Sequence, residues 1–198
     1  MGLTPPELIK QALGKHAVER VDGTGMMPAS VMILFYLKEG EYCILLNKRS
    51  EEVEHHKGEM SFPGGARDPE DTDSLDTALR ETEEEMGIKR EDVTVLGEMD
   101  EIVTRSNFQV SVFAGTIEYP YRFTPSAIEI AEVVEFPVSA LIDPVNRRVE
   151  TRWVNGMPLT SYSYVHEEHV VFGATARILQ SCIEILDDRL ESEGHQVD

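Results

Sequence analysis

Residues 80–87, with the sequence Arg-Glu-Thr-Glu-Glu-Glu-Met-Gly, constrain this chain more than any other segment. Apolar groups recur around them at offsets 0, 3, 4, 7 and 11, and belong to Leu75, Ala78, Leu79, Thr82 (through its methyl) and Met86. This spacing is typical of a half-buried α-helix. Asp73 or Ser74 can cap its start and Gly87 can end it. The sequence therefore predicts a helix between these residues.

Three glutamates of this helix, Glu81, Glu84 and Glu85, lie within about one turn of one another, roughly opposite the apolar residues. Like charges this close repel, and only Arg80 is spaced to pair with them along the helix. A solvated acidic face is one interpretation. The other is a metal site, because Mg²⁺ prefers carboxylate oxygens and keeps waters that a phosphate can displace. The Gly64-Gly65 pair favours the metal site, since it lets backbone approach a ligand and the Gly65 carbonyl can add an oxygen ligand.

The same segment resembles the Nudix box, in which a glycine, five residues, a glutamate and seven residues precede Arg-Glu-aliphatic-x-Glu-Glu-x-Gly-aliphatic. The matching residues are Arg80, Glu81, Glu84, Glu85, Gly87 and Ile88. The first half differs, because Thr72 stands at the glutamate position and Ala66 at the glycine position. One inserted residue would place Gly65 at the glycine position. The nearby charges that could replace the first glutamate are Glu70, Asp71 and Asp73.

A second stretch is similar to the signature of the coenzyme A pyrophosphatase branch of this family. That signature reads roughly Leu-Leu-Thr-x-Arg-Ser, an arginine four residues later, then a glycine and Phe-Pro-Gly-Gly. Residues 45–50, Gly58 and residues 62–65 follow it, with Asn47 for the threonine and Glu54 for the second arginine. Residues 172–177 resemble the Trp-Gly-x-Thr-Ala-Arg start of the last helix of the branch. The resemblance runs from about residue 30 to about residue 186.

The second stretch also holds a basic island, made of Lys48, Arg49, His55, His56 and Lys57. Cationic donors suit a phosphate-rich ligand, and arginine offers a planar fork. The same residues can also be plain charges at a strand end and in a loop. We expect substrate contacts from Lys48, Arg49, Lys57, Phe62 and Gly64. Zinc is not expected, because no cysteine or third histidine stands at ligand spacing.

The resemblance implies a Mg²⁺- or Mn²⁺-dependent hydrolase that cleaves a nucleoside diphosphate linked to another group. Glu81, Glu84, Glu85 and Gly65 would hold the metal, and Arg80 would orient the carboxylates. Glu129 resembles the downstream glutamate of many Nudix enzymes, a ligand or the base that activates water. A polar residue at the start of a strand is an equally good interpretation of Glu129.

The favoured substrate is coenzyme A or an acyl-coenzyme A, cleaved to adenosine 3′,5′-bisphosphate and a phosphopantetheine moiety. One alternative is an ADP-ribose or dinucleotide pyrophosphatase, which Glu54 supports because a carboxylate near a 3′-phosphate is unfavourable. Another is a nucleotide-binding module without catalysis. The intact set of three glutamates argues against this last alternative.

Charge and cysteine content limit the partners and the compartment. The 37 acidic and 18 basic residues give a net charge of −19, which argues against nucleic acid and anionic membranes as partners. A small-molecule diphosphate is expected instead, with a homodimer as the one protein partner considered. Cys43 and Cys182 lie in apolar or amphipathic segments and predict buried free thiols. With no signal segment and the longest apolar run at 31–37, a cytoplasmic protein is expected.

The order of elements predicts one domain over residues 1–198, an α/β fold of the α+β type. The resemblance implies the Nudix α/β/α sandwich, with a central mixed sheet between helices. A short helix and a loop fill residues 1–28, and a frayed tail fills 191–198. Strands are expected at 31–37, 42–46, 93–96, 100–103, 110–117, 129–134, 148–154 and 159–164. A helical turn is expected at 137–141 and a closing helix at 173–190, and Asn155-Gly156 predicts a hairpin turn.

Overall fold

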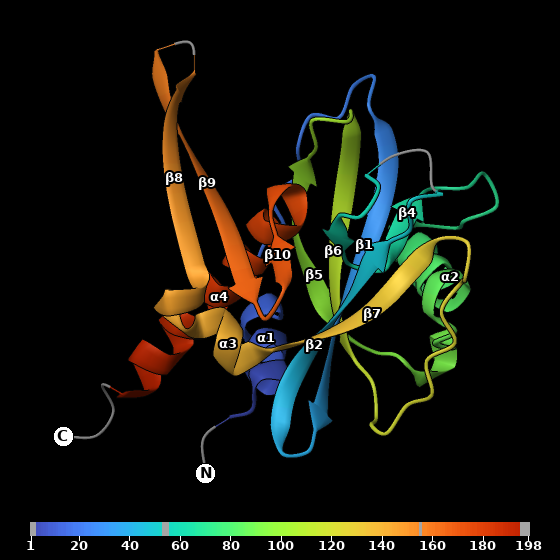
Figure 1. The fold of residues 1–198 in the computed structure, drawn as a ribbon, viewed down its shortest axis with the longest axis horizontal. Helices are drawn as coiled ribbons and strands as arrows, with labels where there is room; N and C mark the ends of the chain where they lie inside the picture. The colour runs from blue at the N-terminus through green and yellow to red at the C-terminus, as the bar shows by residue number, and fades with distance from the viewer. Residues whose placement is uncertain (1–2, 53–55, 155, 195–198) are drawn as a thin grey trace.

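The computed structural model describes residues 3–52, 56–154 and 156–194. Its centre is a mixed seven-stranded sheet (Figure 1), with the order β3-β2-β1-β6-β5, β4 paired with β1 and β7 paired with β2. Its strands are β1 (Met27–Lys38), β2 (Glu41–Arg49), β3 (Met60–Ser61), β4 (Gly64–Ala66), β5 (Thr94–Val103), β6 (Phe108–Thr116) and β7 (Ile130–Pro137). β1 and β6 run parallel, and the other pairings are antiparallel.

Helices cover both faces of this sheet. Figure 1 shows α2 on one side and α1 and α4 on the other. The helices are α1 (Pro5–Leu13), α2 (Ser74–Met86), α3 (Val138–Ile142) and α4 (Gly173–Gly194), with 3₁₀ turns at Arg90–Asp92 and Pro144–Asn146. A separate three-stranded sheet, in the order β10-β9-β8, follows α3 and consists of β8 (Arg147–Val154), β9 (Met157–His166) and β10 (His169–Val171).

The two faces of the sheet carry separate hydrophobic cores. Along β1, Met32, Leu34 and Tyr36 point toward α2, whereas Ile33 and Phe35 point toward α1 and α4. Side chains of a strand alternate between the faces of a sheet, so a strand buried on both faces is apolar at every position. This explains why residues 31–37 are continuously apolar.

The predicted mixed sheet between helices is confirmed, and so is the pair of free, buried cysteines. Several details differ, and one of them is that β1 begins at Met27, inside the segment 1–28 that was expected to hold only a helix and a loop. The strands expected at 93–96 and 100–103 form the single strand β5, and the last helix continues to Gly194. The short strands β3, β4 and β10 and the separate sheet were not predicted. Asn155 lies outside the described residues. No helix in the described part of the chain has the length and apolar character needed to cross a membrane.

Candidate active site

Helix α2 begins and ends through the residues that its sequence predicts. The Asp73 carboxylate caps it by accepting a hydrogen bond from the Asp76 N–H at 2.8 Å. Gly87 ends it with a φ of 68°, a left-handed conformation that glycine adopts without steric cost. The buried side chains of the helix include Ala78, Thr82 and Met86. The helix therefore sits on the sheet with its acidic residues beside β2 and β4.

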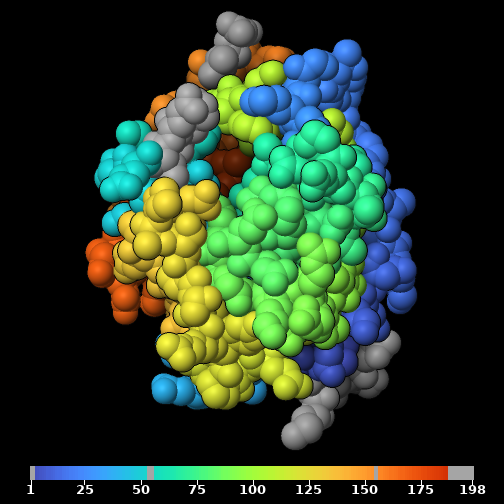
Figure 2. Space-filling view, turned by 90° about the vertical axis from the view of Figure 1, so that its right-hand side faces the viewer, coloured from blue at the N-terminus to red at the C-terminus, as the bar shows by residue number. Residues whose placement is uncertain are grey.

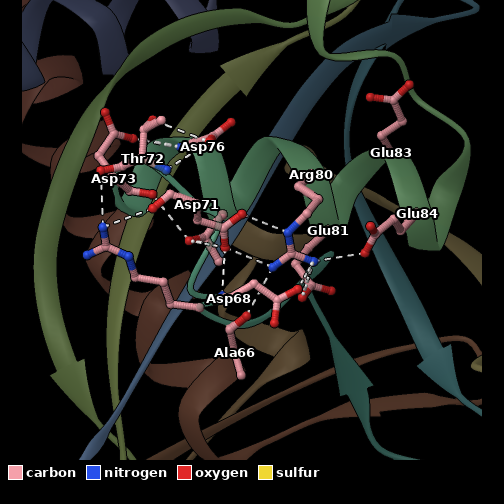
Figure 3. Close-up of polar contacts among 12 residues, drawn as sticks. Ala66, Asp68, Asp71, Thr72, Asp73, Asp76, Arg80, Glu81, Glu83 and Glu84 are labelled. Atoms are coloured by element: carbon pink, nitrogen blue, oxygen red, sulfur yellow. Dashed lines mark hydrogen bonds and ion pairs between the residues drawn. The ribbon is translucent and has the colours of Figure 1, made fainter.

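A buried ion pair holds this helix to the loop that precedes it. Arg80 Nε lies 2.8 Å from Asp71 Oδ1, and Arg80 Nη2 lies 3.0 Å from Asp71 Oδ2. Arg80 Nη2 also donates to the Ala66 carbonyl oxygen at 3.1 Å. Arg80 Nη1 donates to Glu81 at 2.9 Å and to Glu84 at 2.8 Å. Figure 3 shows the guanidinium between Asp71 on one side and the two glutamates on the other. Arg80 thus orients two of the predicted metal ligands.

Asp71 is the acidic residue that pairs with Arg80. Its side chain is buried and also accepts hydrogen bonds from the Asp68 N–H and the Thr77 hydroxyl. The hydrogen bonds from Arg80, Asp68 and Thr77 hold the pKa of Asp71 well below its usual range, although burial opposes them. The other candidates have different positions, since Asp73 caps the helix and Glu70 is exposed. The sequence alone had left this choice open.

Glu85 is buried, with 3% of its surface exposed, and faces the sheet. Its Oε2 accepts hydrogen bonds from the Gly64 N–H and from Asn47 Nδ2, each at 3.1 Å, and its Oε1 lies 3.5 Å from Arg49 Nη1. Burial raises the pKa of Glu85 to about 7, although the Gly64 hydrogen bond and the Arg49 charge oppose that rise. The expectation that all three glutamates share one polar face was therefore wrong for Glu85. Of the three glutamates, only Glu84 is exposed.

The alternation of β2 decides which of its residues reach the helix. Asn47 and Arg49 point toward α2 and meet Glu85, and Asn47 also accepts a hydrogen bond from the Ser61 hydroxyl. Lys48 lies between them and therefore points to the opposite face of the sheet. The structure brings Arg49, and not Lys48, to the carboxylates.

Glu81 packs against the backbone of β4. A Cβ atom added to Gly65 would lie 2.6 Å from the Glu81 carboxylate, so glycine at this position lets the two meet. Burial raises the pKa of Glu81, against the opposing effect of Arg80. The charge of Glu129, which directly precedes β7, contributes to raising the pKa of both Glu81 and Glu85. Glu129 is half-buried, and its role in the site stays a prediction.

The other residues predicted to contact the substrate differ in their burial and in their hydrogen-bond partners. Phe62 is 2% exposed and belongs to the hydrophobic core, so its side chain contributes to packing. The Gly64 N–H donates a hydrogen bond to Glu85. Lys57 is exposed, and His56 hydrogen-bonds to Glu59 and Ser106. Glu54 and His55 lie outside the described residues.

Figure 2 shows a hollow on the face of the molecule that carries α2. It is bordered by the segment around β4, the loop between β5 and β6 and the segment leading to β7, and α4 forms its floor. The start of α4 is tied to this region, because the Thr175 hydroxyl donates to the Met60 carbonyl at 2.9 Å and Arg177 donates to the Val103 carbonyl at 3.1 Å.

The donor set of α2 fits a divalent cation. Arg80 contacts only one oxygen of Glu81 and one of Glu84, and the second oxygen of each has no hydrogen-bond partner among the described residues. Burial is the main cause of the raised pKa values of Glu81 and Glu85, and the charges of neighbouring glutamates add to it. Carboxylate oxygens are the ligands that a hard cation such as Mg²⁺ prefers, and a bound cation would offset both effects.

A group of three residues that could bind a metal ion occurs elsewhere in the described part of the chain. The ligand atoms of Glu132, Glu168 and His169 all lie within 4.8 Å of one another. Glu132 pairs with Lys48 in the sheet and shares its face, opposite α2. A cavity of about 450 Å³ is also lined by Glu132 and His169, and none of the α2 glutamates lines it. This group is therefore separate from the site predicted on α2.

The sequence had indicated no role in this site for Asn47 and Ser61. They form a chain of hydrogen bonds from β3 through β2 to Glu85. The one available signal was a polar residue at the end of a buried strand, in a run that is otherwise apolar from Cys43 to Leu46. A buried amide needs partners, and the partner here comes from a helix that lies 38 residues further along the chain.

Comparison with known proteins shows the family of this chain. The family model described as NUDIX domain matches residues 26–153, so β9, β10 and α4 follow the matched segment. The uncharacterized Nudix hydrolase NudL of Pectobacterium atrosepticum is 34% identical over 149 residues, which cover 74% of this chain and 76% of that protein. The peroxisomal coenzyme A diphosphatase NUDT7 of Mus musculus is 32% identical over 115 residues, 58% of this chain and 49% of that protein.

A solved structure agrees at the level of the fold. The MutT/nudix family protein from Enterococcus faecalis superposes with a TM-score of 0.54 and 15% identity, covering 94% of this chain and 70% of that chain. At this identity the likeness concerns the fold alone.

The Arg80–Asp71 pair makes a direct prediction about stability. We expect Asp71→Asn to lower the free energy of unfolding by about 2 to 3 kcal/mol, because it leaves a largely buried guanidinium without its anionic partner. Chemical denaturation followed by circular dichroism measures this. Asp68→Asn is the matched control, since Asp68 is exposed and lies 4.0 Å from Arg80, and should cost about 0.5 kcal/mol or less. Equal losses in the two variants would contradict the role given to Asp71.

The buried Glu85 predicts a pH-dependent stability. Its pKa in the folded chain, about 7, lies above the ordinary value of 4.5, so the folded state holds this proton more tightly. Ionisation of Glu85 therefore destabilises the fold as the pH rises from about 4.5 to 7, by about 3 kcal/mol at most. In EDTA, Glu85→Gln should raise the thermal midpoint at pH 8.5 by several degrees more than at pH 5.5. The exposed Glu83→Gln should show no such difference, and the same shift at both pH values for Glu85→Gln would refute the assignment.

Proposed function

This chain belongs to the NUDIX domain family and is a hydrolase of diphosphate bonds, and we propose that its substrate is coenzyme A or an acyl-coenzyme A. The products would be adenosine 3′,5′-bisphosphate and a phosphopantetheine moiety. The observation that carries the hydrolase assignment is the cluster of Glu81, Glu84 and Glu85, of which Arg80 orients the first two. A binding module without catalysis has no need for three carboxylates held in this way.

We propose that Glu81, Glu84, Glu85 and the Gly65 carbonyl hold Mg²⁺ or Mn²⁺. The bound cation would polarise the diphosphate and lower the pKa of a water molecule. Arg80 acts indirectly, because Asp71 and the Ala66 carbonyl fix its guanidinium, which in turn fixes Glu81 and Glu84. Arg49 and Asn47 hold Glu85 from the side of the sheet. The chain thus orients its carboxylates before substrate arrives, which avoids reorganisation during the reaction.

We propose Glu129 as the base that takes a proton from the attacking water. It stands at the start of β7, and the Ser50 N–H donates to its backbone carbonyl at 2.8 Å, which fixes this segment beside the end of β2. Its charge contributes to raising the pKa of both Glu81 and Glu85. A carboxylate is a group that can accept the proton of an attacking water.

Two observations support coenzyme A over other diphosphates. Residues 45–50, Gly58 and residues 62–65 resemble the signature of the coenzyme A branch, and one relative bears the name of a coenzyme A diphosphatase. At two signature positions, Gly64 and Asn47, the residues donate hydrogen bonds to Glu85, although Asn47 itself departs from the signature threonine. Glu54 supports the alternative, an ADP-ribose or dinucleotide pyrophosphatase, because its charge opposes a 3′-phosphate.

The metal assignment predicts a loss of turnover. Glu84→Gln removes a charged ligand from an exposed position, so we expect kcat with Mg²⁺ or Mn²⁺ to fall about 100-fold or more while the thermal midpoint stays within about 2 °C. Glu83→Gln is the matched control, since Glu83 is exposed one residue earlier on the same helix, and its kcat should stay within about twofold. A Glu84→Gln enzyme as active as wild type would refute the assignment.

The substrate assignment predicts an order of preference. We expect kcat/KM for coenzyme A to exceed those for dephospho-coenzyme A and ADP-ribose, measured at equal concentration with each cation by product chromatography. ADP-ribose as the best substrate would favour the alternative. Binding of all three without cleavage would leave only a nucleotide-binding module.

A further inference from the structure

A group of metal-binding side chains joins the small sheet to the central one. Glu132 belongs to β7, whereas Glu168 lies in the turn between β9 and β10 and His169 is the first residue of β10. Figure 1 shows β10 beside the central sheet, where it also contacts β3. Glu132 and His169 are 37 residues apart in the chain, so spacing in the sequence could not indicate this group.

His169 is the buried member of the group. Its side chain is 8% exposed, and its Nε2 lies 3.1 Å from Glu132 Oε1. Its Nδ1 is buried and has no hydrogen-bond partner among the described residues. Buried polar atoms are nearly always paired, and an unpaired one calls for an explanation such as a bound ion or water. Within the described chain, the one polar contact of this ring is therefore an exposed carboxylate, which favours a ligand role over a structural one.

The separation of the two contacting atoms fits a shared metal ion. Zn²⁺ binds histidine nitrogen and carboxylate oxygen at about 2.0 to 2.2 Å, so two neighbouring ligand atoms stand about 3.0 to 3.4 Å apart. The distance of 3.1 Å between His169 Nε2 and Glu132 Oε1 lies in this range. Glu168 can supply a third ligand, because its carboxylate belongs to the same group and is exposed.

The charges around the group favour a cation. The cavity of about 450 Å³ that Glu132 and His169 line has five glutamates and one lysine among its lining residues. The lysine, Lys38, already pairs with Glu135. Among the described residues, Glu132 forms an ion pair with His169 alone, although Lys48 stands opposite it in the register. An anion would be repelled here, whereas a cation can enter from the cavity and keep water at its remaining coordination positions.

We propose that Glu132, Glu168 and His169 form a second divalent-metal site, which takes a transition metal such as Zn²⁺ and links the two sheets. Imidazole nitrogen suits zinc and related transition metals, whereas Mg²⁺ prefers ligand sets made of oxygen. The oxygen ligands of α2 and this mixed group therefore select different ions. A bound metal fixes the β9–β10 turn to β7 and stabilises the folded chain. The second site does not depend on the identity of the substrate.

The test is Zn²⁺ binding to the full chain by competition with a chromophoric chelator, in 5 mM Mg²⁺ so that the oxygen ligands of α2 are contested. We expect a Zn²⁺ ion that Mg²⁺ does not displace. Glu132→Gln and Glu168→Gln should each raise its dissociation constant about tenfold or more, because each removes a charged ligand. Both residues are exposed, so both variants should fold. With Zn²⁺ 100-fold above the wild-type dissociation constant, the thermal midpoint of the wild type should rise by several degrees, and that of the variants by less.

Matched controls separate ligation from general acidity. Glu167→Gln removes the charge next to Glu168 in the same turn, from a residue that lines the cavity but does not belong to the group. It should keep the dissociation constant within about threefold, because a neighbouring charge is screened by water and salt. Glu84→Gln on α2 should leave Zn²⁺ binding in Mg²⁺ unchanged.

Three results would overturn the proposal. One is the lack of Mg²⁺-resistant binding at 100 µM Zn²⁺, which would make the contact between His169 and Glu132 a hydrogen bond between sheets and no more. Another is binding that Glu84→Gln weakens and Glu132→Gln does not, which would place the zinc on α2. The third is equal weakening by Glu167→Gln and Glu168→Gln, which would indicate a diffuse acidic surface.

Discussion

The ion pair between Arg80 and Asp71 is the interaction on which the candidate site depends. One side of the guanidinium is fixed by a buried carboxylate and a backbone carbonyl, and the other side holds Glu81 and Glu84. An arginine held in this way has little rotamer freedom left, so it fixes the positions of the carboxylates that it contacts. The loop after β4 and the helix that follows it are thereby positioned as one unit.

The buried carboxylate of Glu85 lowers the stability of the fold. Its carboxylate is removed from water and compensated by two neutral donors and one arginine at 3.5 Å. A buried charge with incomplete compensation lowers stability, and natural proteins keep such groups mainly where chemistry requires them. The buried position of Glu85 therefore agrees with a functional role better than with a structural one.

Local patterns in the sequence predicted a large part of this architecture. The period of α2 and its terminal glycine depend on neighbours in the chain, and both were predicted; Asp73 was one of two candidates for the cap. The burial of Glu85 was missed because helical periodicity places it with the polar residues, whereas in the fold Asn47 and Arg49 of β2 and Gly64 of β4 contact it. Asp71 was one of three candidates, because only the folded loop decides which carboxylate reaches Arg80. Strands of two or three residues, such as β3 and β10, carry too little pattern to predict.

The strict alternation of β2 has an evolutionary consequence. Asn47 and Arg49 serve the helix side, while Ile44 and Leu46 fill the opposite core. An insertion or deletion of a single residue within this strand would exchange the two sets, placing hydrocarbon against the carboxylates and an amide in the far core. Length changes among relatives should consequently be confined to the loops on either side. The length of the strand itself is fixed, because one face serves the candidate site and the other serves the core.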